Sequence, residues 1–250
     1  MPTSTALRLL WDRAALLGLL AMVLCYLCQP ERYQDAGLAP AFLLLYVPAL
    51  VGNYASIPLF WAPASRPGQR IQLFLPSIIV GLIGWSSFVP AASWLVSPLL
   101  SLRPDFDPLR EVPVLAFYVV AGEVWFYSVH RVIHARRKLY LLLHVHHHRI
   151  TDPHVINASY QHPLELILIT MGTGWAGPLL LSGHASTVAL WGALIMFAGN
   201  YGHSGIGSIH DRHHRRFKGN YGFLFLDDLL STARSGLRLG GESPLRTQGG

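Results

Sequence analysis

The sequence contains little charge. Asp, Glu, Lys and Arg together make up 13% of its 250 residues, while apolar residues make up 52%. A typical soluble domain has about 25% charged residues, so this composition excludes a chain whose surface mostly faces water. It predicts an integral membrane protein.

Cysteine is also scarce. The two cysteines, Cys25 and Cys28, stand in the apolar stretch CYLC, whereas a redox or zinc pair needs polar and accessible surroundings. We interpret them as small apolar residues of a membrane helix. No disulfide framework is possible beyond this one pair.

Acidic residues are outnumbered: 13 Asp and Glu stand against 19 Lys and Arg, which gives a net charge of +6. The basic residues form no long continuous tract. They lie just outside apolar segments, as they do in the cytoplasmic loops of membrane proteins. We therefore expect no nucleic acid among the partners.

The apolar runs predict an all-α fold with about four transmembrane helices and then a hairpin or re-entrant pair. The predicted spans are 14–28, 38–61, 71–89 and 114–130, and the pair comprises 164–181 and 187–200. The members of the pair are marginal as spans, because crossing a bilayer core takes about 20 apolar residues. The first span could instead be a signal peptide, but we favour a retained anchor because no cleavage site is convincing.

One of these segments, and the stretch that follows another, depart from a straight transmembrane helix. Pro40, Pro48 and Pro58 predict that the second span is kinked or broken. After the third span, the stretch 90–102 is expected to dip into the membrane or to lie on it, and 102–113 is expected to be a loop.

The distribution of charge predicts the orientation. If the amino terminus is cytosolic, Arg8, Arg13, Arg66, Arg70 and the basic residues of 131–138 all fall on the cytosolic side. The loops on the other side balance their arginines with acidic residues, which satisfies the positive-inside rule. The histidine-rich part of the chain should therefore face the cytosol.

The chain has 13 histidines, and their spacing is more informative than their number. HRVIH contains an HxxxH pair, and two later segments each contain HxxHH. These eight histidines are His130, His134, His144, His147, His148, His210, His213 and His214. Residues three and four apart share a helix face, so the three groups can surround two metal ions. Neutral imidazole suits zinc, copper, iron or nickel, and the excess of ligands argues against a structural zinc.

Simpler interpretations exist for each group alone. A lone HxxxH is more often a packed pair, and a histidine run can be a solvated basic face or an adventitious metal binder. Three such groups on one predicted side of a membrane favour a metal site. His146 lies off the helical face of its neighbours, His154 stands in a loop where it can be solvated, and His184 stands in a turn, so we expect these three to be structural.

The wider motifs resemble those of the fatty acid hydroxylase/sterol desaturase superfamily of membrane non-haem di-iron oxygenases. The resemblance covers 123–232 through EVWFYSVHRVIH, LYLLLHVHHH, ASYQHPLE, GNYGHSG, HDRHH, NYG and LDDLLST. The 4-methylsterol oxidase branch is the most similar. The resemblance implies that the eight histidines are iron ligands, and His162 and His203 match further positions that complete the shell.

The resemblance also matches polar positions, to which we assign the orientation of ligating imidazoles. These are Glu123, Glu165, Asn200, Asp211 and Asp227. For Glu123 and Glu165 the alternative is an interfacial charge solvated by water. No catalytic residue is expected beyond the di-iron centre.

The implied activity is that of an O2-dependent oxidoreductase, a monooxygenase that hydroxylates or successively oxidises an unactivated C–H bond of a lipid, expected to be a sterol. The implied cofactors are two iron ions, with O2 as co-substrate and electrons from NAD(P)H through cytochrome b5 and its reductase. We expect the endoplasmic reticulum membrane, or the inner membrane of a bacterium. A basic face could dock the carrier, although simple positive-inside topology explains it equally well. That face comprises Arg136, Arg137, Lys138, Arg215, Arg216 and Lys218.

Three parts are expected: membrane anchor helices and loops (1–113), a di-iron catalytic domain (114–232) and a disordered tail (233–250). Two departures from the family pattern leave alternatives open. The segment 204–209 is short, and LLST lacks the usual glycine. The alternatives are a sterol desaturase or a fatty acyl or sphingolipid hydroxylase on the same scaffold, and a catalytically silent metal-binding membrane protein. Nothing in the sequence indicates an oligomeric state.

Overall fold

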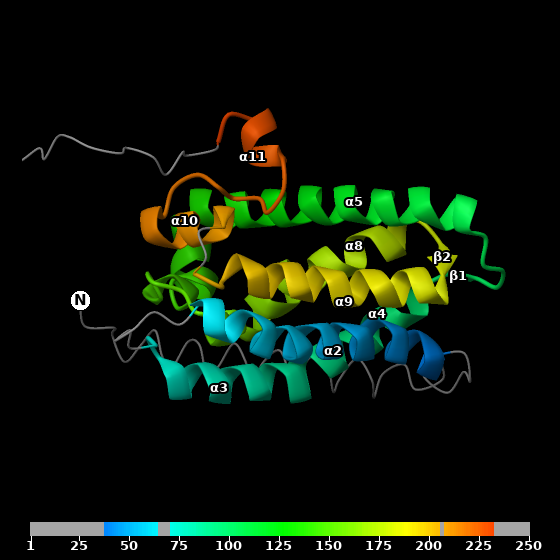
Figure 1. The fold of residues 1–250 in the computed structure, drawn as a ribbon, viewed down its shortest axis with the longest axis horizontal. Helices are drawn as coiled ribbons and strands as arrows, with labels where there is room; N and C mark the ends of the chain where they lie inside the picture. The colour runs from blue at the N-terminus through cyan, green and yellow to red at the C-terminus, as the bar shows by residue number, and fades with distance from the viewer. Residues whose placement is uncertain (1–37, 65–70, 206–207, 233–250) are drawn as a thin grey trace, which may run out of the picture.

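The computed structural model describes residues 38–64, 71–205 and 208–232 (Figure 1). The predicted span 14–28, the CYLC stretch and the predicted tail 233–250 lie outside the described residues. The described chain is mostly helical, which confirms the all-α class.

Three helical segments are long and apolar enough to cross a membrane: Ala41–Trp61, Phe74–Leu99 and Pro108–Ala135. The first lies in α2 (Leu38–Ala64), which runs without interruption. Of the predicted kink or break, the break is therefore absent, and the prolines are accommodated inside one continuous helix. The candidate span ends at Trp61, as predicted for 38–61.

The second segment is assembled from shorter helical pieces. It joins α3 (Phe74–Ile83), a π-helical turn (Gly84–Phe88), α4 (Val89–Val96) and a 3-10 turn (Ser97–Leu99). Most of the stretch 90–102 thus continues the span, instead of lying on the membrane as a separate element.

The third segment is α5 (Pro108–Ala135). It begins where Asp107 accepts a hydrogen bond from the main-chain N–H of Leu109 (3.1 Å) and Pro108 takes the first helical position. Such a cap satisfies an otherwise unpaired N–H. The loop predicted for 102–113 therefore ends at Asp107.

The predicted hairpin is present. Its first arm comprises α7 (Pro163–Glu165), a π-helical turn (Leu166–Met171) and α8 (Gly172–Leu180), and its second arm is α9 (Ala185–Gly202). At its tip, β2 (Gly183–His184) pairs in parallel with β1 (Leu102–Arg103). The hairpin packs α8 against α5 and α9 against α2 (Figure 1).

The apolar core lies between these helices, while other apolar side chains point outward. Trp85, Tyr118 and Leu166 are almost fully buried, whereas Leu59 and Leu75 are each 62% exposed. Exposed large apolar residues occur along α2, α3 and α5. This distribution fits helices surrounded by lipid.

The remaining elements gather at one end of the long helices (Figure 1). The chain leaves α5 through α6 (Arg137–Leu139), a π-helical turn (Tyr140–His144) and a 3-10 turn (His147–Arg149). A further 3-10 turn is formed by Val155–Asn157. After α9 come α10 (Ile209–Arg216) and α11 (Leu226–Leu229). All three histidine segments meet at this end.

Candidate metal centre

Nine histidines form two groups in which one ring nitrogen of each member lies within 4.8 Å of the others. The first group is His130, His134, His144, His148 and His213; the second is His147, His203, His210 and His214. The nine comprise the eight histidines predicted from spacing, together with His203. Both HxxHH segments are divided between the groups: His147 separates from His144 and His148, which lie in turns, and His213 separates from His210 and His214 on α10.

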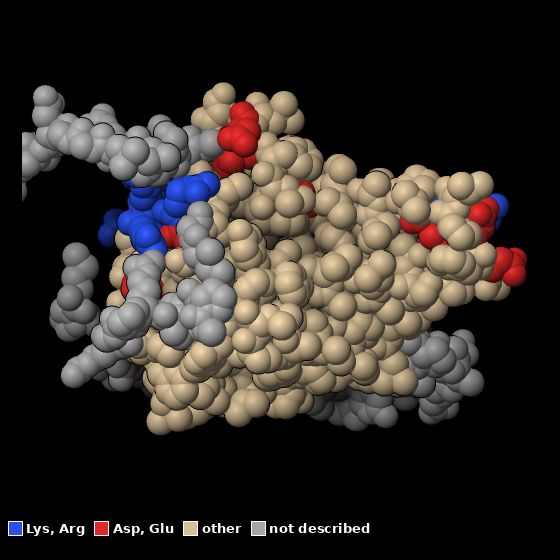
Figure 2. Space-filling view, in the orientation of Figure 1, with Lys and Arg blue, Asp and Glu red and all other residues tan. Residues whose placement is uncertain are grey.

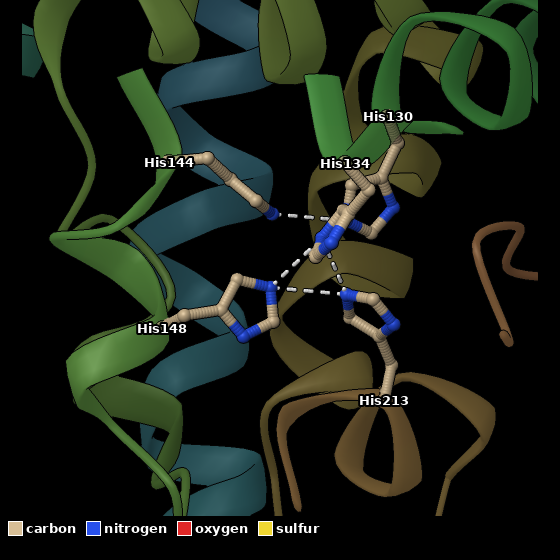
Figure 3. A group of neighbouring side chains, drawn as sticks. All are labelled: His130, His134, His144, His148 and His213. Atoms are coloured by element: carbon tan, nitrogen blue, oxygen red, sulfur yellow. Dashed lines mark hydrogen bonds between the residues drawn. The ribbon is translucent and has the colours of Figure 1, made fainter. Parts of the chain in front are cut away.

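In the first group, five Nε2 atoms converge (Figure 3). The Nε2 atoms of His130 and His144 lie 3.0 Å apart, and those of His134 and His148 lie 3.1 Å apart. The Nε2 atom of His213 is 3.0 Å from each of the latter two. Only His134 is partly exposed; the other four are buried.

The second group is fully buried and equally close. The Nε2 atom of His203 lies 3.0 Å from that of His147 and 3.2 Å from that of His214. The ring of His210 is centred 4.6 Å from that of His203. His203 reaches this group from the end of α9, whereas His210 and His214 stand on α10.

Main-chain carbonyls fix the tautomer of five of these histidines. In each of these rings Nδ1 donates to a carbonyl oxygen: His130 to Tyr221 (2.8 Å), His147 to Tyr160 (3.2 Å), His203 to Gly199 (2.8 Å), His213 to Gly219 (2.7 Å) and His214 to Ile150 (2.9 Å). A carbonyl can only accept, so the single proton of each neutral ring is on Nδ1 and Nε2 carries a lone pair. Burial lowers the pKa of His147, His203 and His214, which keeps them neutral.

Three bare Nε2 atoms therefore face one another in the second group. Two lone pairs 3.0 Å apart form no hydrogen bond, and their mutual repulsion is relieved by a cation between them. The donor set thus fits a transition metal, which prefers neutral imidazole. The same carbonyl contacts orient ligating rings in metalloproteins.

Glu165 lies behind one ligand of the first group. Its Oε1 is 2.7 Å from Nδ1 of His144, and both residues are buried. Burial raises the pKa of Glu165 and lowers that of His144, so without a cation the pair is a neutral hydrogen bond. A cation at Nε2 of His144 would favour the ionised carboxylate and complete a carboxylate–histidine–metal arrangement. This is the contact expected for Glu165.

Asp227 and Glu123 act on the loop that carries the carbonyl of Tyr221. Asp227 accepts from the main-chain N–H groups of Tyr221 (2.8 Å) and Gly222 and from Thr232. Glu123 accepts four main-chain N–H groups, those of Phe223, Leu224, Phe225 and Leu226, at 3.0–3.2 Å. Asp227 therefore supports His130 through Tyr221, whose carbonyl oxygen accepts from the imidazole. Glu123 contacts the loop, and its hydrogen bonds go to main-chain N–H groups and not to an imidazole.

Asp211 and Asn200 also bind elsewhere. Asp211 caps α10 in a reciprocal pair with Ser208 and accepts the N–H of Gly205 (3.0 Å). The side chain of Asn200 donates to α2, to the carbonyl of Asn53 (2.7 Å) and the hydroxyl of Ser56 (2.7 Å). Asn200 orients no imidazole in these contacts, whereas Asp211 acts on His203: burial lowers the pKa of that imidazole, and the charge of Asp211 raises it in opposition.

The other histidines lie outside both groups. His162 caps α7, because its Nδ1 accepts the N–H of Leu164 (3.1 Å), and its Nε2 therefore carries the proton. His146 is buried but belongs to neither group. His154 is fully buried beside Trp61, so the expected solvated loop position is wrong. His184 caps α9.

A cavity of about 70 Å³ reaches both groups. Its histidine wall contains His130, His144, His147, His203 and His210. Its apolar wall comprises Phe126, Ile169, Ile195, Met196 and Phe223. An apolar molecule in this cavity would lie beside the metal positions. The sequence alone did not identify these walls, because apolar residues that line a cavity look like those that face lipid.

Comparisons with known proteins agree with this geometry. Residues 115–232 match the family model described as fatty acid hydroxylase. The chain is 31% identical over 184 residues to a putative methylsterol monooxygenase of Dictyostelium discoideum, covering 65% of this chain and 66% of that protein. It is 32% identical over 142 residues to fatty acid hydroxylase domain-containing protein 2 of Homo sapiens (50% and 42%).

A shorter match concerns a different lipid. A sphingolipid C4-hydroxylase of Schizosaccharomyces pombe is 45% identical over 62 residues, which cover 24% of this chain and 20% of that protein. The chain thus spans less than two thirds of the length of these relatives. No solved structure matches it.

Proposed function

Through residues 115–232 this chain belongs to the fatty acid hydroxylase family, and we propose that it is a membrane-bound di-iron monooxygenase that oxidises a lipid. The substrate proposed first is a sterol, hydroxylated or successively oxidised at an unactivated C–H bond. The sterol oxidase branch is favoured by the similarity to a methylsterol monooxygenase. We also keep the division into anchor helices up to residue 113 and a catalytic domain over 114–232 as a proposal.

The observation that carries this proposal is the pair of buried histidine groups. All nine ligands proposed here present a ring nitrogen to one of two centres, and the tautomers of five are set by main-chain carbonyls. Iron bound there would supply the activation of O2 and the oxidation of a C–H bond. His162 is left out of the proposed ligand set because its Nε2 is protonated in this arrangement.

The chain's own residues contribute orientation and a dry site. The carbonyl contacts hold the ligating rings, and Glu165 holds His144. The apolar wall of the cavity excludes water and would place the lipid next to the second group, three of whose four histidines line the cavity. No other side chain is needed to move a proton in this proposal.

Metal content tests the proposal, with His146 as a matched control. We expect about two irons per chain in the purified protein, loss of at least one in His147→Ala, and no loss in His146→Ala, since only His147 belongs to a group. Metal analysis of the detergent-purified variants measures this. A wild-type protein without transition metal, or an equal loss in both variants, would contradict the proposal.

Product analysis then separates the reactions. Membranes containing the protein, supplied with ¹⁸O2 and a reductant, should incorporate the label into a 4-methylsterol. The similarity to a sphingolipid C4-hydroxylase motivates the second candidate, in which the label enters a sphingoid base. Bound iron without product in either lipid class would favour the third reading, a catalytically silent metal-binding membrane protein.

The histidine end is also basic, as expected of a surface that attracts an acidic electron carrier. Figure 2 shows Lys and Arg side chains gathered where α10 lies. Arg131 and Lys218 line a cleft of about 380 Å³ together with His134, the one partly exposed ligand. We propose that a carrier such as cytochrome b5, reduced by its NAD(P)H-dependent reductase, docks over this cleft on the cytosolic side of the endoplasmic reticulum, or of the inner membrane in a bacterium.

A further inference from the structure

Two asparagines from different helices lie in the wall of the cavity. Asn53 of α2 is 4% exposed and Asn200 of α9 is 2% exposed, and both line the cavity that contains His147 and His203. A buried amide without a hydrogen-bond partner costs several kcal/mol, about 2–7 depending on the reference state.

The orientation of both amides is fixed by their contacts. Nδ2 of Asn200 donates to the main-chain oxygen of Asn53 (2.7 Å) and to Oγ of Ser56 (2.7 Å), and it lies 3.3 Å from Oδ1 of Asn53. Because a main-chain oxygen only accepts, the nitrogen of Asn200 must point to α2. Its oxygen, and the nitrogen of Asn53, then have no hydrogen-bond partner within the part of the chain that the structure describes. Neither atom is among the enclosed polar atoms that lack a partner, so both remain accessible to a small polar group.

The unpartnered atoms are one acceptor and one donor on neighbouring amides. A hydroxyl group can donate once and accept twice, so it satisfies both. We propose that Asn53 and Asn200 bind the hydroxyl group of a lipid alcohol in the cavity: the hydroxyl donates to Oδ1 of Asn200 and accepts from Nδ2 of Asn53.

This inference rests on the proposed function, because it takes the cavity as the substrate site, and it narrows the substrate class. A plain hydrocarbon would leave both amides unsatisfied, which is costly in a buried site. A fatty acid carboxylate would oppose the carbonyl oxygen of Asn200 with its own acceptors. A sterol hydroxyl and a long-chain alcohol share the required chemistry.

Binding by matched lipid pairs tests the proposal without turnover. The purified full-length protein in nanodiscs is titrated anaerobically with cholesterol or 5-cholestene, which lacks the hydroxyl, and with octadecan-1-ol or octadecane. Quenching of the tryptophan fluorescence measures the affinity. In at least one pair, we expect the alcohol to bind about tenfold more tightly, the effect of one net hydrogen bond in a buried site.

Two variants separate hydroxyl binding from the packing of α2 on α9. Asn53→Leu removes the donor but keeps the main-chain oxygen that holds Asn200, so it should abolish the preference for the alcohol. Ser56→Ala removes a hydrogen bond of the same network, but Ser56 does not line the cavity. The preference should persist in Ser56→Ala.

Equal affinity of alcohol and hydrocarbon in both pairs would overturn the proposal, and so would an equal loss of preference in the two variants. If Asn53→Leu does not fold, the wild-type comparison decides alone. Iron content is measured on the same samples. Metal-loaded protein without a preference refutes only the hydroxyl site, whereas an alcohol preference without bound metal refutes only the proposed oxygenase.

Discussion

The histidines of this protein differ in what their Nδ1 atoms do. In five of the nine grouped histidines, Nδ1 donates to a main-chain carbonyl, which leaves the Nε2 lone pair for a metal. In His154, His162 and His184, Nδ1 instead accepts a main-chain N–H at the start of a helix or turn. The second arrangement puts the proton on Nε2, so proton placement separates ligand candidates from caps.

At the residue scale, Glu165 should determine metal affinity without touching the metal. Glu165→Ala removes the acceptor 2.7 Å from Nδ1 of His144. Loss of the hydrogen-bond partner of a ligating histidine typically lowers metal affinity about 10–100-fold. Competition with a chelator measures the affinity. Glu165→Gln, which keeps an acceptor oxygen, should lose less, and Thr170→Val in the same cavity wall serves as control. Unchanged affinity in Glu165→Ala would refute the role.

At the scale of helices, glycine sets the approach of α9 to α2. A Cβ atom on Gly52 would lie 2.4 Å from the main-chain oxygen of Ala193 and 2.7 Å from its Cα. Main-chain atoms cannot rotate away as a flexible side chain can. The two helices, and with them the Asn53–Asn200 contact, therefore depend on a residue without a side chain at position 52.

The substitution Gly52→Ala should accordingly destabilise the protein by about 1–3 kcal/mol, the usual cost of overpacking a tight contact. Thermal unfolding of the detergent-purified protein measures the effect. Gly192→Ala is the matched control, because its Cβ would lie 3.5 Å from Pro48, an ordinary contact distance. It should be neutral or slightly stabilising. A similar melting temperature for Gly52→Ala and wild type would contradict the argument.

At the scale of the whole molecule, charge is divided between the two ends of the long helices. Arg103 and Glu111 form an ion pair at one end (3.1 Å), with Asp105, Asp107 and Arg110 near them. The histidine end is strongly basic, with exposed Arg131, Arg136, Arg137, Lys138, Arg215, Arg216 and Lys218. Between these two ends of the described helices, the histidine end is the one that would attract an acidic partner.

Reversal of one charge in the cleft over His134 tests this partner. Lys218→Glu should raise the KM for reduced cytochrome b5 roughly fivefold at low ionic strength, since charges at an interface mainly change association, and added salt should diminish the difference. Arg110→Glu, at the opposite end of α5, should have no effect. Equal KM values for both variants would rule out docking at this cleft, provided that metal content is unchanged.

The sequence by itself determined the membrane class and the helical hairpin, and it named all nine grouped histidines, eight from their spacing and His203 from the family resemblance. These features depend on local properties: hydropathy along the chain, and spacings of three and four residues. For the same reason it did not establish that α2 is unbroken, since whether a helix continues past Pro48 and Pro58 depends on the helices packed around it. It also treated each HxxHH as one helical face, although 144–148 and 210–214 are each divided between the two centres.

Only the tertiary structure decided which side chains meet and where their protons lie. His203 joins His147 across 56 residues, and Asn200 reaches Asn53 across 147. The carbonyl of Tyr221 fixes His130 from a loop held by Asp227 and Glu123. Each of these contacts depends on the packing of distant segments, which spacing along the chain does not contain. The donor atoms were therefore predictable by residue, but their grouping, their tautomers and the cavity beside them were not.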